Sequence, residues 1–106
     1  MMQMEIKKAK LYHLTLKENL PLIMKNGLIP KKQKDWIPNI KAIFFWDSLE
    51  FTRSICDEES AILQVEIPED YLIGKWLNEG WNIFEFYVMK PILPENIKII
   101  QEGEKI

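Results

Sequence analysis

Short apolar runs separated by polar turns recur along the chain and predict a protein built mainly of β-strands. Ile83–Met89 is almost wholly apolar, Ala42–Trp46 is apolar and aromatic, and Lys10–Leu14 is a shorter run of the same kind. Ala61–Ile67 alternates partly between apolar and polar residues, which predicts a strand with one face in water. A last strand is expected at Ile97–Ile100.

Two other segments have helical patterns, and the first is predicted to begin at Asn19 and end at Gly27. Asn19 is a favourable N-cap, Pro21 is tolerated in a first turn, and Gly27 suits the left-handed conformation that follows many helices. Three apolar residues at helical spacing share one face: Leu20, Ile23 and Met24. A short amphipathic helix is therefore expected here.

The second helix is expected directly after Ala42–Trp46. Asp47, with Glu50 three residues later, has the spacing of a capping box. Apolar residues continue from there to about Cys56 and provide a face that can pack on a core.

Two segments predict no regular element. Lys31–Asn39 combines charged residues and turn formers with Trp36, and it is expected to be the longest loop. Trp36 is either a lid that folds back on the core or a contact to a substrate. Glu69–Asn82 is irregular, and Trp76 and Trp81 within it are expected to be packing groups.

Strands outnumber helices, and both helices lie in the first half of the chain, so the predicted fold class is α+β with a mostly antiparallel sheet. The regular alternation of strands and helices that is typical of a doubly wound fold is missing. A length of 106 residues is close to the commonest domain size, so residues 1–106 are expected to form a single domain.

Charge and cysteine content narrow the functional classes. The net charge is -2, so bulk electrostatic attraction to nucleic acid is not expected. The lone Cys56 cannot form an internal disulfide, which favours a reducing compartment, and it is expected to be a small buried residue. The longest uninterrupted apolar run, Ala42–Trp46, is too short for a signal peptide or a membrane span. The protein is therefore expected to be cytoplasmic, without membrane contact.

Common site classes are absent from the sequence. There is no phosphate-binding loop, no glycine-rich dinucleotide motif and no serine-nucleophile elbow. One histidine and one cysteine cannot build a typical zinc site, so no metal is expected. Two polar residues in apolar strands remain, His13 and Glu85, and each needs a partner or a purpose if it is buried.

Three motifs together resemble the ADP-ribosyltransferase-like superfamily, in its branch with a His-Tyr-Glu pattern. Tyr12-His13-Leu14-Thr15 is similar to the first motif, and its closest likeness is to the toxins that ADP-ribosylate DNA. The segment Ala42-Ile43-Phe44-Phe45-Trp46-Asp47 is similar to the second motif, and Glu85-Phe86-Tyr87-Val88 is similar to the third. The resemblance covers nearly the whole chain and implies a small, split and mostly antiparallel sheet.

The resemblance also implies roles for particular residues around NAD, which is the substrate of the family. The pattern His, Tyr and Glu maps onto His13, Phe44 and Glu85. His13 would hydrogen-bond the adenosine ribose, Phe44 would stack on the nicotinamide ring, and Glu85 would be the catalytic carboxylate that holds the hydroxyl of the nicotinamide ribose. Thr15 would contact the nicotinamide amide.

The chain departs from the family at two points. Phe44 keeps a stacking surface but lacks the hydroxyl of the usual tyrosine. The only arginine is Arg53, whereas many relatives use arginine on the diphosphate of NAD. Four lysines are alternatives for that role as point charges: Lys31, Lys32, Lys34 and Lys41.

The resemblance implies an NAD-dependent mono-ADP-ribosyltransferase that modifies a protein or a nucleic acid, acting as a toxin or effector in a bacterial or phage conflict. An antitoxin or inhibitor is an expected partner, and Trp36 is the residue expected to contact the target. Two alternatives are an inactive module that binds a nucleotide or a partner protein, and an NAD glycohydrolase with water as the acceptor.

Overall fold

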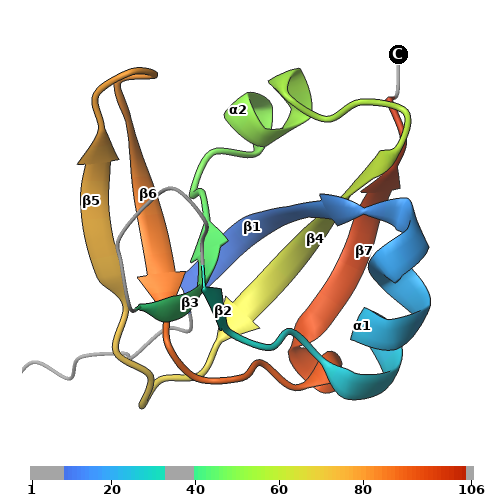
Figure 1. The fold of residues 1–106 in the computed structure, drawn as a ribbon, viewed down its shortest axis with the longest axis horizontal. Helices are drawn as coiled ribbons and strands as arrows, with labels where there is room; N and C mark the ends of the chain where they lie inside the picture. Colours follow the sequence, from blue (N-terminus) through green and yellow to red (C-terminus); the bar gives the residue numbers. More distant parts are fainter. Residues whose placement is uncertain (1–8, 33–39, 105–106) are drawn as a thin grey trace, which may run out of the picture.

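The computed structural model describes residues 9–32 and 40–104, and it has an α+β fold in which two antiparallel sheets stand side by side (Figure 1). One sheet has the strand order β1 (Ala9–Leu16), β4 (Ser60–Ile67), β7 (Ile97–Glu102). The other has the order β2 (Lys31–Lys32), β3 (Lys41–Phe45), β6 (Ile83–Val88), β5 (Gly74–Asn78). The helices are α1 (Leu20–Asn26) and α2 (Leu49–Ser54). The predicted fold class and the position of both helices in the first half are confirmed.

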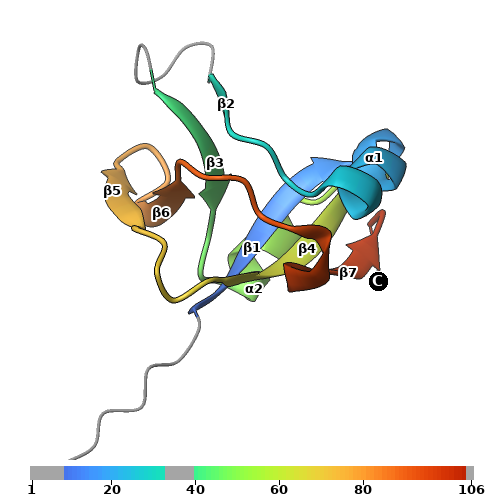
Figure 2. The same ribbon diagram turned by 90° about the horizontal axis from the view of Figure 1, so that it is seen from below.

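The two sheets meet where β1 runs beside the end of β3. Tyr12 and Trp46 form an isolated antiparallel bridge, in which each backbone N–H donates to the other residue's carbonyl oxygen at 2.8 and 2.9 Å. Figure 2, turned by 90°, shows β3 between the β5–β6 hairpin and the three-stranded sheet. The bridge therefore holds two sheets that otherwise diverge.

The core lies around β4, the central strand of the three-stranded sheet. The side chains of Ala61, Ile62, Leu63 and Val65 have essentially no exposed area. The predicted strand with one wet face is correct only for its second half, where Gln64 and Glu66 are half-buried. In its first half, residues 60–63, the strand is buried on both faces, and β1 and β7 pair with its two edges.

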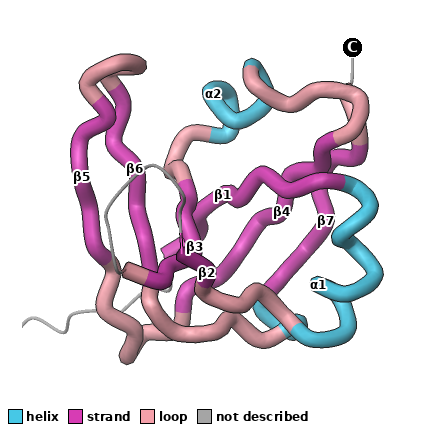
Figure 3. The backbone as a smooth tube through the Cα atoms, in the orientation of Figure 1, coloured by secondary structure: helices cyan, strands magenta, loops and turns pink. Residues whose placement is uncertain are grey.

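Helix α1 packs beside the three-stranded sheet between Asn19 and Gly27, as predicted, but its buried face is less apolar than predicted (Figure 3). Leu20 and Ile23 are buried, but Met24 is 36% exposed, so the predicted third packing residue is wrong. Asn19 precedes the helix as predicted, yet its side chain makes no capping hydrogen bond because a 3-10 turn (Lys17–Asn19) leads into the helix.

Gly27 ends α1 with a positive φ of 85°, and its ψ of -174° differs from the left-handed helical value that the sequence suggested. This combination belongs almost exclusively to glycine. Gly27 N–H donates to the Ile23 carbonyl at 2.7 Å, and the next residue, Leu28, forms a two-bond bridge with Ile92. The chain therefore turns sharply from the helix into contact with the segment before β7.

Helix α2 begins one residue later than the predicted capping box requires. Ser48, rather than Asp47, is the N-cap, and its hydroxyl accepts a hydrogen bond from Phe51 N–H at 3.0 Å. The helix ends at Ser54, slightly before the predicted end at about Cys56. Aspartate and serine are both favourable N-caps, so capping preference alone does not distinguish Asp47 from Ser48.

Two further differences concern segments predicted to lack regular structure. Lys31–Lys32 forms strand β2, paired with Lys41 and Ala42, so the predicted loop begins later than expected. Gly74–Asn78 forms strand β5, which pairs with β6 along its whole length. Trp36 lies outside the described residues. No helix in the described part of the chain is long and apolar enough to cross a membrane.

The close approach at the end of α1 predicts that Gly27→Ala destabilises the protein. A Cβ on Gly27 would lie 2.0 Å from the Ile92 carbonyl oxygen, in addition to the strain of the positive φ. We expect a loss of about 2 kcal/mol or more in the free energy of unfolding, measured by urea denaturation.

Gly80→Ala is the matched control, because a Cβ there would meet only the Asn78 side-chain oxygen, at 3.4 Å. Its free energy of unfolding should stay within about 0.5 kcal/mol of the wild-type value. Equal stability of the Gly27→Ala variant and the wild type would contradict the described turn.

Candidate functional site

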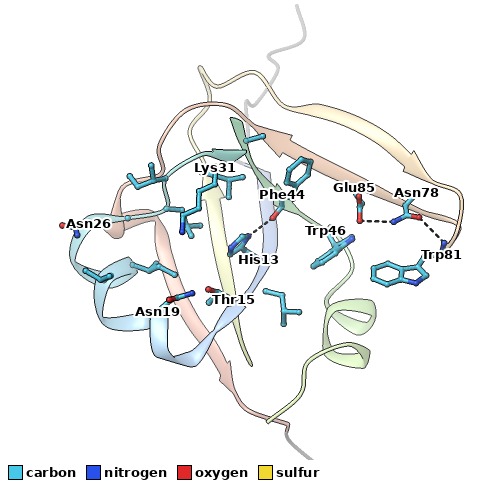
Figure 4. Close-up of a pocket in the computed structure, with 18 residues that line it drawn as sticks. His13, Thr15, Asn19, Asn26, Lys31, Phe44, Trp46, Asn78, Trp81 and Glu85 are labelled. Carbon is cyan, nitrogen blue, oxygen red and sulfur yellow. Dashed lines mark hydrogen bonds between the residues drawn. The ribbon is translucent and has the colours of Figure 1, made fainter. Parts of the chain in front are cut away.

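One pocket of about 810 Å³ lies between α1, the end of β1, strand β3 and the β5–β6 hairpin (Figure 4). The four described residues for which the motifs implied roles all line it: His13, Thr15, Phe44 and Glu85. His13 and Thr15 come from β1, Phe44 from β3 and Glu85 from β6. Residues far apart in the sequence are therefore brought to one cavity.

His13 is held by a hydrogen bond across the junction of the sheets. Its Nδ1 lies 2.7 Å from the carbonyl oxygen of Phe44. A carbonyl oxygen only accepts, so Nδ1 carries the proton and Nε2 of the neutral ring is left with a lone pair. The ring is also packed against Phe45, with ring centroids 5.6 Å apart. The geometry thus fixes both the orientation and the tautomer of the imidazole.

The surroundings of His13 favour its neutral form. Burial lowers the pKa of His13 below its ordinary value, and the nearby positive charge of Lys31 lowers it further. The hydrogen bond to the Phe44 carbonyl acts in the opposite direction, but burial is the largest cause. His13 is therefore a hydrogen-bonding group with an available acceptor at neutral pH, rather than a cation.

Phe44 rests on a second aromatic ring that the strand register places opposite it. Phe44 pairs with Tyr87 of β6, and the two ring centroids are 5.9 Å apart. Tyr87 in turn pairs with Gly74 of β5, where an added Cβ would lie only 2.1 Å from the Tyr87 ring. Gly74 thus makes room for the ring that supports Phe44.

The Glu85 carboxylate receives one hydrogen bond on each oxygen. Trp76 Nε1 donates to Oε1 at 2.9 Å, and Asn78 Nδ2 donates to Oε2 at 3.3 Å. Both donors are neutral side chains in the described part of the chain. Each oxygen keeps further acceptor capacity, so the fixed carboxylate can still accept a bond from a ligand hydroxyl.

Asn78 links Glu85 to the turn of the β5–β6 hairpin. Its side-chain oxygen accepts hydrogen bonds from the backbone N–H groups of Gly80 and Trp81, at 3.1 and 3.3 Å. Trp81 lines the pocket beside Glu85 and is 55% exposed, so it packs on only part of its surface. Its ring contacts Phe51 of α2, with centroids 5.4 Å apart.

Trp46 forms part of the same wall. Figure 4 shows its indole between the His13 ring and the side chains of Glu85 and Trp81. Its Nε1 is buried and has no hydrogen-bond partner in the described part of the protein. A buried donor without a partner is uncommon in folded proteins. The Trp46 indole N–H is therefore an unsatisfied hydrogen-bond donor in this wall of the pocket.

Two residues that the sequence singled out lie away from the pocket. Arg53, on α2, donates from its Nε to the Gln101 side-chain oxygen at 3.3 Å and does not line the cavity. Cys56 is buried as expected, at 5% exposed, and burial raises the pKa of its thiol. A thiol in that state is a poor nucleophile.

Within residues 9–32 and 40–104, no group of three or more His, Cys, Asp or Glu side chains is placed to hold a metal ion.

Several residues that line the pocket, or that hold a residue lining it, could not be predicted from the motifs. Trp76 and Asn78 hold Glu85, but both lie in the segment for which no strand was predicted. Trp76 and Asn78 alternate along β5 and share one face with Glu85, so recognition of that strand would have revealed them. Asn19 and Asn26 line the pocket at the two ends of α1. The sequence does not indicate this role, because it depends on how α1 packs against the sheets.

The chain matches no protein-family model, and no curated protein matches it. The likeness to ADP-ribosyltransferases therefore depends on the residues of the three motifs. The structure adds that the corresponding side chains line one pocket.

The neutral state of His13 predicts a specific pH dependence of stability. Because the pKa is lowered in the folded protein, the unfolded chain binds more protons below about pH 6.5, so stability falls as the pH falls from that value towards the folded pKa. His13 can lower the free energy of unfolding by at most about 1.4 kcal/mol for each pH unit in this range.

His13→Asn isolates this contribution, because its amide can donate to the Phe44 carbonyl as Nδ1 does but cannot titrate. Denaturation of both proteins between pH 8 and pH 5 should show wild type losing stability relative to the variant only in the acidic part of the range. A constant difference between the two proteins would contradict a neutral, partly buried imidazole.

Proposed function

We propose that the chain is an NAD-dependent mono-ADP-ribosyltransferase that modifies a macromolecule and acts as a toxin or effector in a bacterial or phage conflict. The single observation that carries the proposal is that His13, Phe44 and Glu85, from three different strands, line one pocket. The volume of about 810 Å³ is in the range of small-molecule and cofactor sites.

The pocket offers suitable contacts for the two halves of NAD. The lone pair on His13 Nε2 is an acceptor for a ribose hydroxyl, and its position is fixed by the bond of Nδ1 to Phe44. The Phe44 ring offers an apolar face to nicotinamide, and the neighbouring Tyr87 ring packs against its side. Thr15 lies on the same face of β1 as His13, and its hydroxyl can form a hydrogen bond with the nicotinamide amide.

Glu85 is the proposed catalytic residue. In the reaction the bond between C1' of the ribose and the nicotinamide nitrogen breaks, and its electron pair leaves with neutral nicotinamide. Positive charge develops on the ribose, and a carboxylate already fixed by Trp76 and Asn78 stabilises that charge while it holds the 2'-hydroxyl. A nucleophilic atom of the target then bonds to C1' and releases its proton.

A binding module without catalysis is the second candidate, and two observations favour it. Phe44 lacks the hydroxyl that the family pattern has, and Arg53 is bonded to Gln101 outside the pocket. A third reading, NAD hydrolysis, uses the same pocket with water as the acceptor. The three functions differ in whether nicotinamide is released and in whether a target is needed.

Nicotinamide release from NAD separates these functions. The protein should release nicotinamide in the presence of cell extract and transfer labelled ADP-ribose to a macromolecule in that extract. Glu85→Gln keeps the size of the side chain but removes the charge, so release should slow by at least about 100-fold.

Glu95→Gln is the control, because Glu95 is exposed, lies in the 3-10 turn before β7 and does not line the pocket. Its rate should equal that of wild type. Release without extract would indicate hydrolysis. NAD binding without release would indicate the binding module, and no binding or release in either condition would refute the proposal.

A further inference from the structure

The proposed function requires a partner for the negatively charged diphosphate of NAD. Arg53 is excluded by its position on α2 and its bond to Gln101. Lys34 lies outside the described residues, which leaves Lys31, Lys32 and Lys41 among the lysines that the sequence offered for this role. Their positions on β2 and β3 can be compared directly.

The strand register separates these three lysines by the face on which they lie. Lys31 pairs with Ala42, and both residues line the pocket. Lys32 pairs with Lys41, and neither lines the pocket. Directly opposed residues on antiparallel strands project to the same face, and successive residues project to opposite faces. Lys31 is thus directed to the pocket side, together with Ala42 and Phe44.

Lys31 has no competing cation around the cavity. Among the described residues that line the pocket, it is the only lysine or arginine, and His13 is held in its neutral form. Figure 4 shows the Lys31 side chain extending from β2 toward the wall that α1 provides, where Asn19 and Asn26 add amide groups. This side of the pocket is therefore the part suited to an anion.

The order of the strands also separates the anion-binding side from the catalytic side. Strand β3 lies between β2, which carries Lys31, and β6, which carries Glu85. His13 and Phe44 lie between Lys31 and Glu85 in Figure 4. A ligand that spans the pocket thus meets a cation on one side of the Phe44 ring and a carboxylate on the other.

We propose that Lys31 binds the diphosphate of the ligand and makes the pocket select a dinucleotide or nucleoside diphosphate over an uncharged nucleoside. The inference rests on the proposed function. A lysine contacts phosphate as a point charge with up to three donors, without the paired geometry of arginine.

The test compares Lys31→Gln with Lys32→Gln, a matched control that removes the same charge from the adjacent residue on the opposite face. ADP-ribose, which retains the diphosphate and both riboses, is the probe for calorimetric titration. Lys31→Gln should weaken ADP-ribose binding by at least about tenfold, since a charged hydrogen bond is lost, whereas Lys32→Gln should bind as wild type does.

Three further measurements sharpen the result. Lys31→Arg keeps a cation and should restore most of the affinity. The affinity of wild type for ADP-ribose should fall with added salt more steeply than that of Lys31→Gln. Adenosine, which has no phosphate, should bind both proteins equally in a ligand-observed NMR titration.

The outcomes separate the two proposals. ADP-ribose binding that is equal in Lys31→Gln and Lys32→Gln would overturn the role of Lys31 and leave the proposed function standing. A wild-type protein that binds neither NAD nor ADP-ribose would overturn both. An equal loss of adenosine and ADP-ribose affinity in Lys31→Gln would show a change in pocket shape rather than a phosphate contact, and would also overturn the inference.

Discussion

The short junction between β1 and β3 is the constraint on which the pocket depends. Two backbone hydrogen bonds join Tyr12 to Trp46, and the adjacent His13 side chain adds a third bond, to the Phe44 carbonyl. These bonds bring a strand of the first sheet into register with a strand of the second. His13 and Phe44 lie next to this bridge. A shift of β1 along β3 would therefore move the His13 imidazole away from Phe44. It would also break the hydrogen bond to the Phe44 carbonyl that selects the tautomer of His13.

Away from the junction the two sheets diverge, and α1 and the β5–β6 hairpin close the space between them as pocket walls. The hairpin is made rigid by side chains of its own: Asn78 bonds both the turn and Glu85, while Trp76 bonds the other carboxylate oxygen. A carboxylate in a largely apolar strand is costly unless it is hydrogen-bonded. The same bonds that offset this cost also fix the carboxylate, so its stabilisation and its proposed role have a common structural cause.

The charges around the pocket are few and separated. In the described lining, Lys31 is the one lysine or arginine, Glu85 is the one carboxylate, and His13 is neutral between them. An arrangement of this kind favours a ligand with an anionic group on one side and a centre of developing positive charge on the other. In the reaction that we propose, the diphosphate of NAD would be the anionic group, and the ribose of the breaking bond would carry the developing positive charge.

The sequence by itself determined the elements whose signals are local. Apolar runs predicted β1, β3, β4, β6 and β7, Gly27 marked the end of α1, and His13 and Glu85 were recognisable as polar residues in apolar strands. Only the tertiary structure decided which side chains meet. The cap at Ser48, strand β5, the exposed Trp81 and the choice of Lys31 over Lys32 depend on strand register and on burial between distant segments. Such contacts arise from the pairing of residues far apart in the chain, which no local pattern of polar and apolar positions encodes.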